Sequence, residues 1–588
     1  MSLKTSKLNN KPISQSFLKG AMVLTLSMVL VKFCGLLQKV LLTNLYSTMG
    51  ESYGEFGSGL FANAYELYVP LFTLATVGFP IAISRMISEA CSKGRYKDVR
   101  RTFKVAKPFF IIMGTICFSL MTAGGFVYVK YIDSPYSLPA ILMLAPTIFF
   151  GCLVSVYRGY FEGLRNMTPT ALSEIIEAVA KIVIGVALSY LVINTGVAEY
   201  HNSGTVFGLS FSSKDEAYRT LLSFSVAASI FGITAGSFLS FLYLKLRFAV
   251  KKGDIPKESF RLSPEPAAKR VIFKNMVSFA LPVGVGALAM SFANSIDAAL
   301  LNKILRNMVD SFPNELFLVY PKLQKEIFTT KTAHTCIWGY YSSCLTILSI
   351  VAAVTQVFGT SAMPNVTAAY TKGDSRELKK SIETVIHLSA IFAFPCGIGL
   401  TVLSKPILSL VYFSNPNIPE YGAAVLQIMG IASVFMGLCT PVCSMLQGVG
   451  KAKITMLVYV SGTALKVIIS YFFARNININ IAGTAIGALV SNLIMCVVAS
   501  VLLMKFTKVS LDFLSVLIKP FISAVICAVC AGFCCYKLNL NVLVSVVISA
   551  IIYLSFLLIL HTFSKDEIKK ALNCKKIVII LEKLHLIG

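Results

Sequence analysis

The stretch "ALSEIIEAVAKIVIG", residues 171–185, places Glu174, Glu177 and Lys181 in a run of otherwise largely apolar side chains. Glu177 precedes Lys181 by four residues, which is the favourable order for an ion pair along one helix face. A charge at the centre of a bilayer costs at least about 2.5 kcal/mol, so such groups normally face a partner or a wet cavity. The three groups therefore either hold one helix against its neighbours or bind a charged ligand.

A second lysine, Lys466, occupies the equivalent place in a partly repeated sequence. The segment "FEGLRNMTPTALSEIIEAVAKIVI" aligns with "LQGVGKAKITMLVYVSGTALKVII", and the alignment superposes Lys181 on Lys466. At a rise of 1.5 Å per residue, each lysine is expected about 16 to 18 Å into its span, near the membrane midplane. The positions of the two glutamates are taken by Tyr459 and Gly462, so only the lysine is repeated.

Five further ionisable residues fall within or at the ends of apolar runs. Lys32 and Lys39 share one helix face in the first run, which contains no Asp or Glu. Lys39 could extend toward the membrane surface, which makes Lys32 the more informative of the two. Arg85 is expected at the cytoplasmic end of its span, whereas Glu66 and Asp297 are expected toward outer ends, where they complete a polar cavity or meet water.

Lysines on several helices predict a cationic site. An ammonium group binds phosphate as a point charge, so the favoured ligand carries an anionic head group such as a phosphate or diphosphate. The predicted head-group contacts are Lys32, Lys39, Lys181 and Lys466, with Glu174 and Glu177 as charge partners or coupling groups.

The sequence predicts no metal, no cofactor and no catalytic residue. The five histidines are scattered and form no HExxH motif. Cys527 and Cys530, in "CAVC", lie in an apolar run where cysteine more often packs as a small hydrophobic side chain. Outside the expected spans, no stretch interleaves aromatic and basic residues as nucleic-acid-binding proteins do.

Composition places the chain in a membrane. Of its 588 residues, 56% are hydrophobic and only 14% are charged, with a mean hydropathy of +0.75, whereas soluble domains have about 25% charged residues. Apolar runs of about twenty residues recur throughout and predict an all-α protein with fourteen spans. The expected spans are 17–43, 60–89, 107–130, 137–162, 170–194, 219–246, 272–300, 336–364, 382–403, 420–446, 454–474, 480–504, 512–536 and 540–562.

The distribution of Lys and Arg predicts the orientation of these spans. One side of the predicted membrane holds more than three times as many Lys and Arg residues as the other. The richer side comprises the two tails and loops such as 90–107, 158–165 and 245–274. Because cationic loops resist translocation, both termini are expected in the cytoplasm. The net charge of +26 is then mainly a topology signal, and the basic rim can also hold anionic lipid.

The repeat predicts two parallel six-helix lobes, a plan typical of transporters with a midplane site. The Pro-rich, charged stretch 251–271 reads as a cytoplasmic linker between them. The expected parts are a tail (1–16), an N-lobe (17–250), the linker, a C-lobe (272–505), two extra spans (506–563) and a basic tail (564–588).

Three segments resemble a known family. "GLFANAYELYVPLFTLATVGFPIAISRMISEACSKG", "YRGYFEGLRNMTPTALSEIIEAVAKI" and "SIDAALLNKIL" are similar to the stage V sporulation protein B type of polysaccharide exporter. That family sits in the multidrug, oligosaccharidyl-lipid and polysaccharide (MOP) flippase superfamily, which also holds murein lipid flippases. The resemblance implies fourteen helices, two lobes in a V and transbilayer movement of undecaprenyl-linked saccharides. The murein lipid flippases carry arginines in the first, second and eighth helices. This sequence instead has lysines in the first helix, no basic residue midway along the second and none in the eighth.

We therefore expect a transporter, not an enzyme, that flips an undecaprenyl-diphosphate type of saccharide by alternating access across a bacterial cytoplasmic membrane. Its expected partners are this substrate, membrane lipids and either a coupling ion (Na⁺ or H⁺) or the membrane potential, with a monomeric chain. A multidrug exporter of the same superfamily is the alternative, with Glu174 and Glu177 as cation ligands. A membrane glycosyltransferase or ligase is a third, although the chain has no DxD motif. The outer loops 195–218 and 301–335 carry no predicted function, and the last two spans could flank a groove for a lipid tail.

Overall fold

Helices make up nearly all of the fold, because a membrane offers backbone N–H and C=O groups no partners except one another. The computed structural model describes residues 17–560, apart from 51, 77, 252–254, 256–259, 262 and 513, together with residue 562. Within these residues, thirteen helical segments are long and apolar enough to cross a membrane. The prediction of an all-α polytopic membrane protein is thereby confirmed.

The predicted seventh span, 272–300, lies inside α9 (Lys269–Ser311), a helix of 43 residues that is not among those thirteen. The predicted fourteenth span corresponds to α19 (Val542–Ile559). The predicted tails 1–16 and 564–588 lie outside the described residues. Fourteen spans with both termini in the cytoplasm accordingly remain a prediction.

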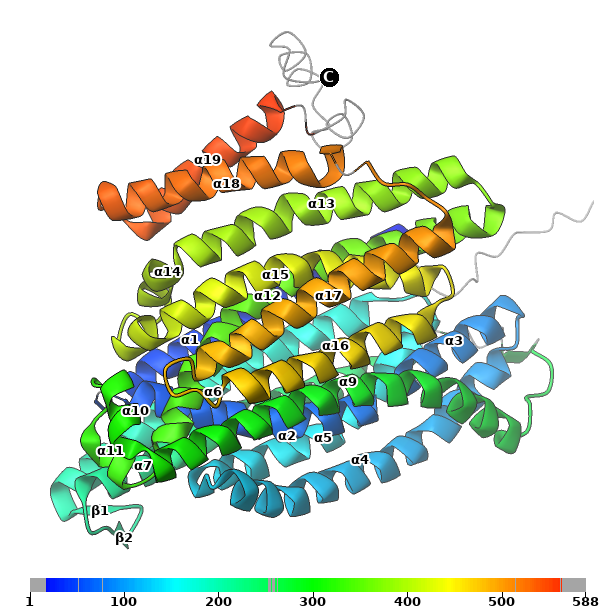
Figure 1. Ribbon diagram of the computed structural model, residues 1–588. Coiled ribbons are helices and arrows are strands. Elements are labelled where there is room, and N and C mark those ends of the chain that lie inside the picture. The colour runs from blue at the N-terminus through cyan, green and yellow to red at the C-terminus, as the bar shows by residue number, and fades with distance from the viewer. Residues whose placement is uncertain are drawn as a thin grey trace, which may run out of the picture. The chain divides into compact units, whose positions relative to one another are not determined.

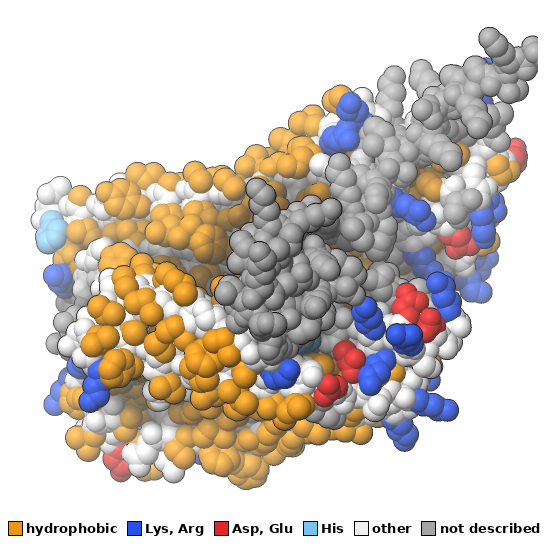
Figure 2. Space-filling view, turned by 90° about the horizontal axis from the view of Figure 1, so that it is seen from above, with side chains coloured by type: hydrophobic (Ala, Val, Ile, Leu, Met, Phe, Trp, Pro, Cys, Tyr) orange, Lys and Arg blue, Asp and Glu red, His pale blue; other side chains and the backbone are white. Residues whose placement is uncertain are grey.

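The surface is that of a protein surrounded by lipid. Large hydrophobic side chains are exposed along the helices, such as Ile112 at 60%, Val127 at 71% and Ile551 at 61%. On the face drawn in Figure 2, hydrophobic side chains cover most of the described surface, and most of the charged side chains in view gather at its right-hand end. Apolar exposure of this extent would cause a soluble protein to aggregate.

Contacts divide the chain into two compact units, and unit 1 consists of residues 1–49 and 59–299. In it, α6 packs along α7, α5 packs against α4 and α7, and α1 packs against α6 (Figure 1). Its described elements are α1 (Phe17–Ser47), most of α2 (Tyr53–Thr76), α3 (Gly78–Ser92), α4 (Tyr96–Ile132), η1 (Pro135–Ser137), α5 (Leu138–Gly163), α6 (Thr168–Ser203), β1 (Thr205–Val206), β2 (Leu209–Ser210), α7 (Lys214–Val250) and the first part of α9.

Unit 2 consists of residues 50–58 and 300–588. Helix α15 lies at its centre and packs against α12, α13 and α17, while α18 packs against α13 and α19. Its described helices are the start of α2, the end of α9, α10 (Pro313–Val319), α11 (Lys325–Thr329), α12 (Ala333–Lys372), α13 (Ser375–Val402), α14 (Ser404–Val411), α15 (Asn417–Gly448), α16 (Ala452–Phe473), α17 (Ile481–Thr507), the π-helices η3 (Leu514–Ile518) and η4 (Phe533–Lys537), α18 (Lys519–Gly532) and α19.

The segments 195–218 and 301–335, expected as long outer loops, are largely structured. Helix α6 continues to Ser203 and is followed by the β1–β2 hairpin, whose turn is held by the carboxylate of Glu199. The second segment holds the end of α9 together with α10 and α11. Because α6 has 36 residues and is therefore about 54 Å long, it exceeds a hydrocarbon core of about 30 Å and projects beyond it.

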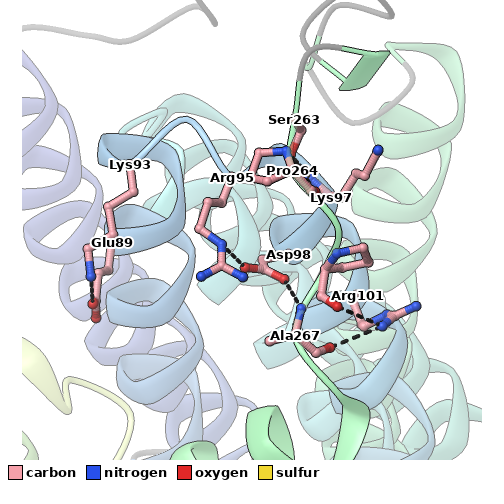
Figure 3. Close-up of polar contacts among 10 residues, drawn as sticks. Glu89, Lys93, Arg95, Lys97, Asp98, Arg101, Ser263, Pro264 and Ala267 are labelled. Atoms are coloured by element: carbon pink, nitrogen blue, oxygen red, sulfur yellow. Dashed lines mark hydrogen bonds and ion pairs between the residues drawn. The ribbon is translucent and has the colours of Figure 1, made fainter.

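The predicted linker 251–271 is tied to α4 in its second half (Figure 3). The backbone N–H of Ala267 donates to Asp98 at 2.7 Å, and the guanidinium of Arg101 donates to the carbonyls of Pro266 and Ala267 at 3.1 Å. Asp98 also forms an ion pair with Arg95 at 2.6 Å. Residues 264–268 are irregular, and side chains of α4 supply their hydrogen bonds. The assignment of 251–271 as a linker between two lobes stays a prediction.

The beginning of α2 belongs to unit 2 and contains one buried carboxylate. Glu55 is fully buried and accepts hydrogen bonds from the hydroxyl of Tyr340 at 2.9 Å and from the side-chain amides of Asn415 and Asn417 at 2.6 and 3.0 Å. Gly339 lies against the backbone of Glu55, where any Cβ would overlap its carbonyl oxygen. The carboxylate thus joins α2, α12 and the start of α15.

We expect Glu55→Ala to lower the stability of unit 2 by about 3 kcal/mol or more, because three buried donors would lose their acceptor. Glu55→Gln keeps one acceptor oxygen and should cost less. Thermal unfolding of the purified protein in detergent measures both effects. An unchanged melting temperature for Glu55→Ala would contradict this account.

Candidate functional site

Lys181 lies on α6 at the point where α1 comes close. The side-chain amide of Gln38 on α1 donates to the backbone carbonyl of Lys181 at 3.2 Å. A Cβ at Gly35, also on α1, would lie 3.5 Å from the Lys181 ammonium nitrogen. Gly35 therefore leaves room beside this charge, and the half-buried Lys181 side chain extends along α1.

Lys32 lies on α1, three residues before Gly35, and its side chain is exposed. Its positive charge acts on Lys181, so two of the predicted cations come together in unit 1. Lys39 is half-buried two turns further along α1 and makes contacts of its own.

Glu177 forms its ion pair with Arg158 of α5, not with Lys181. The guanidinium of Arg158 lies 3.1 Å from the Glu177 carboxylate, and the hydroxyl of Ser237 on α7 donates to the same carboxylate at 3.0 Å. Arg158 also donates to Ser173 of α6 at 2.9 Å and contacts Ser240 of α7 at 3.4 Å. The predicted pair of Glu177 with Lys181 is therefore replaced by a network that links α5, α6 and α7.

Arg158 is the site residue that the sequence analysis missed. It was assigned to the basic loop 158–165, yet it lies inside α5, which continues to Gly163. The available signal was the unbroken apolar run before it, which allows the helix to extend past this arginine. Among the described residues, the Lys181 ammonium has no ion pair with a carboxylate, although the charge of Glu177 acts on it.

Glu174 and two tyrosines complete the surroundings of Glu177. The hydroxyl of Ser27 on α1 donates to Glu174 at 2.8 Å, so this carboxylate faces α1. The phenols of Tyr65 and Tyr68 on α2 lie within electrostatic range of Glu177. Polar groups of α1, α2, α5 and α7 thus lie around one stretch of α6, residues 174–181.

The remaining predicted residues of unit 1 lie elsewhere. The backbone carbonyl of Glu66 accepts from Ser295 of α9 at 2.6 Å, and the Glu66 side chain interacts with Tyr128 of α4. Arg85 is exposed on α3 and interacts with Glu89. Asp297 is buried on α9 and has contacts there. None of these described contacts connects the three residues to Lys181.

Close helix packing fixes the backbone beside the lysine of unit 1. A Cβ at Gly232 on α7 would lie 2.5 Å from the backbone of Gly185 and 3.1 Å from the carbonyl oxygen of Lys181. One turn further, a Cβ at Gly236 would lie 2.7 Å from the carbonyl oxygen of Glu177. Small residues four apart let two membrane helices approach closely, and here they set the position of both charged residues.

The same contact recurs within unit 2. Lys466 is half-buried on α16, and a Cβ at Gly487 on α17 would lie 3.0 Å from the carbonyl oxygen of Lys466 and 2.6 Å from the hydroxyl of Ser470. Lys466 and Ser470 are the positions that align with Lys181 and Gly185. Each unit therefore has a lysine whose backbone is held by a glycine of the following long helix.

Replacing these glycines should destabilise the units. We expect Gly232→Leu and Gly487→Leu to cost about 1 to 3 kcal/mol each, because the new side chain would overlap the neighbouring backbone. Gly124→Leu and Gly399→Leu are matched controls, since nothing lies within 4 Å of a Cβ at either position. Thermal unfolding in detergent compares the four variants, and equal melting temperatures would refute the close-packing account.

The chain is similar to known proteins in sequence and in fold. The "Polysaccharide biosynthesis protein" family model matches residues 17–367, and the "MatE" model matches residues 339–472. The chain is 22% identical to "Lipid II flippase MurJ" of Bacillus subtilis (strain 168), covering 82% of this chain and 81% of that protein. It is also 22% identical to "Stage V sporulation protein B" of the same organism, covering 95% and 98%.

A solved structure shares the fold. An inward-facing multidrug resistance MATE family transporter of the MOP superfamily matches with a TM-score of 0.60 and 15% identity, covering 83% of this chain and 99% of that one. The predicted resemblance to the stage V sporulation protein B type is confirmed by the relatives and by a family model that covers more than half of the chain. The chain belongs to the polysaccharide biosynthesis protein family.

Proposed function

We propose that this membrane transporter flips a lipid-linked saccharide, attached through a phosphate or diphosphate, across a bacterial cytoplasmic membrane by alternating access. Support for the saccharide comes from the family and from the relatives named as a lipid II flippase and a stage V sporulation protein. Support for the anionic head group comes from the charges around α6. The proposed substrate class follows from the two together.

The observation that carries the proposal is the pairing of Glu177 with Arg158. Arg158 takes the ion pair with this carboxylate, so among the described residues Lys181 has no ion pair of its own, and the charges of Glu177 and Lys32 both act on it. Two neighbouring cations in a membrane protein are costly unless an anion binds them. Lys181 and Lys32 are therefore the proposed head-group contacts of unit 1, with Lys39 nearby on α1.

Lys466 is the proposed contact of unit 2. It stands at the aligned position of a helix that is packed in the same way, with Gly487 in the role of Gly232. Such equivalence is expected of an internal repeat, in which each repeat offers a similar group to one substrate. Glu174 is the proposed exchange partner, since its position on α6 lets it compete with the substrate for a lysine of unit 1.

A multidrug exporter is the second candidate, favoured by the "MatE" match and by the shared fold. That activity needs a carboxylate available to a cationic drug. Glu177 is already bound by Arg158 and Ser237, and Glu174 by Ser27, which leaves Lys181 and Lys32 as the charges without a carboxylate partner of their own. The arrangement favours an anionic substrate.

We expect Lys181→Ala and Lys466→Ala each to reduce translocation of an undecaprenyl-diphosphate-linked saccharide in proteoliposomes by about 100-fold, because a desolvated charge contact is lost. Membrane insertion should be unchanged. Lys104→Ala, which removes an exposed lysine near the start of α4, is the control for loss of charge alone. Full activity in the double variant Lys181→Ala, Lys466→Ala would contradict the proposal.

Efflux of a cationic dye separates the two candidates. The flippase predicts no efflux above empty liposomes, with or without Glu174→Gln and Glu177→Gln. The exporter would be established instead by two results together. The native chain would have to export the dye and lose this efflux in both variants, and it would have to show no translocation of the lipid-linked saccharide.

A further inference from the structure

A cavity lies at one end of unit 2, away from Lys466 and its helix packing. Its volume is about 680 Å³, within the range of about 300 to 1,000 Å³ that is usual for small-molecule sites. Three segments form it: the end of α9, helix α10, and the loop between α16 and α17. The predicted topology places this end outside the cell. The lining residues are Met308, Phe312, Glu315, Leu318, Val319, Arg475, Asn476, Ile477 and Asn478.

The polar part of the lining is balanced in charge. Glu315 and Arg475 are both exposed, and no ion pair joins them in the described structure. The Arg475 guanidinium stacks over the ring of Tyr471 at 4.0 Å, which limits its movement. The side-chain oxygen of Asn476 accepts the backbone N–H of Asn478 at 3.0 Å, which leaves its NH₂ group to donate. The cavity thus offers a carboxylate, a guanidinium and two amides.

The apolar part of the lining is accessible as well. Phe312 is 48% exposed and Leu318 is 79% exposed, although both lie outside the predicted spans. Met308, which also lines the cavity, is buried. A ligand that fits this lining must have an apolar face and several hydrogen-bonding groups but little net charge.

The loop behind the cavity contains an unsatisfied buried amide. Asn480, two residues after Asn478, is 1% exposed, and neither its side-chain nitrogen nor its oxygen has a hydrogen-bond partner among the described residues. Its backbone has φ 47° and ψ −120°, a conformation that side chains rarely adopt. Buried polar groups without partners are rare in native proteins, and strain of this kind concentrates at functional sites. Asn480 is an observation independent of the cavity itself.

We propose that this cavity binds the saccharide part of the exported substrate after it reaches the outer side. A sugar ring has an apolar face that can rest on Phe312 and hydroxyl or acetamido groups that can exchange hydrogen bonds with Glu315, Arg475 and the two asparagines. The opposite charges of Glu315 and Arg475 favour a ligand with little net charge, and the four polar side chains favour one that can exchange hydrogen bonds with them. The inference rests on the proposed function, because it identifies the part of that substrate that unit 2 recognises.

The test uses the full chain in nanodiscs. The probe is chitotriose, a soluble N-acetylglucosamine trimer, and its binding is measured by saturation-transfer NMR and by titration. We expect the double variant Arg475→Ala, Asn478→Ala to bind chitotriose about tenfold more weakly than the native chain. Asn314→Ala, an exposed asparagine on α10 outside the lining, is the matched control and should bind normally. Melting temperatures show that each variant is folded.

Absence of chitotriose binding to the native chain, or equal binding by the double variant, would overturn the inference. Binding of the dipeptide L-Ala–D-Glu in place of chitotriose would also overturn it and assign the cavity to peptides. The binding titration tests whether the cavity recognises a saccharide. The translocation assay of the lysine variants tests the proposed function separately.

Discussion

The ion pair between Arg158 and Glu177 determines how the charges of unit 1 are used. A charge pair inside a membrane protein is tolerated only when the remaining donors and acceptors are also satisfied, and here Ser173, Ser237 and Ser240 supply those partners. The network ties three helices together and takes the ion pair of the carboxylate that the sequence places nearest to Lys181. Lys181 is thereby left without an ion pair among the described residues, which is the basis of the proposed anionic substrate.

Helix packing through glycine gives the charges their position. Gly232 brings α7 against the backbone of Lys181, and Gly487 brings α17 against the backbone of Lys466. In lipid, helices gain little from hydrophobic burial, so close van der Waals contact has to fix their separation. The recurrence of one contact in two units supports the internal repeat better than the short sequence alignment does, since it repeats a geometry as well as residue types.

Hydropathy predicted the membrane class and nearly all the spans, because apolar length is a local property of the chain. Ion-pair and hydrogen-bond partners on other helices are not a local property, and the sequence patterns did not predict them. The spacing of Glu177 and Lys181 suggested a pair along α6, but Arg158, nineteen residues earlier on α5, reaches the carboxylate instead. The positive-inside rule assigned Arg158 to a loop, because a cation near the end of a span looks the same in sequence whether it meets water or a buried glutamate. Glu55 shows the same limit, since its amide partners lie 360 and 362 positions away.

The central claim is that Lys181 binds an anionic head group. Native mass spectrometry of the chain with undecaprenyl diphosphate and with uncharged undecaprenol measures the contribution of that charge directly, because the two lipids share a tail. The account predicts that the native chain prefers the diphosphate and that Lys181→Gln loses most of this preference while binding undecaprenol unchanged. An equal preference for the diphosphate in Lys181→Gln would contradict it.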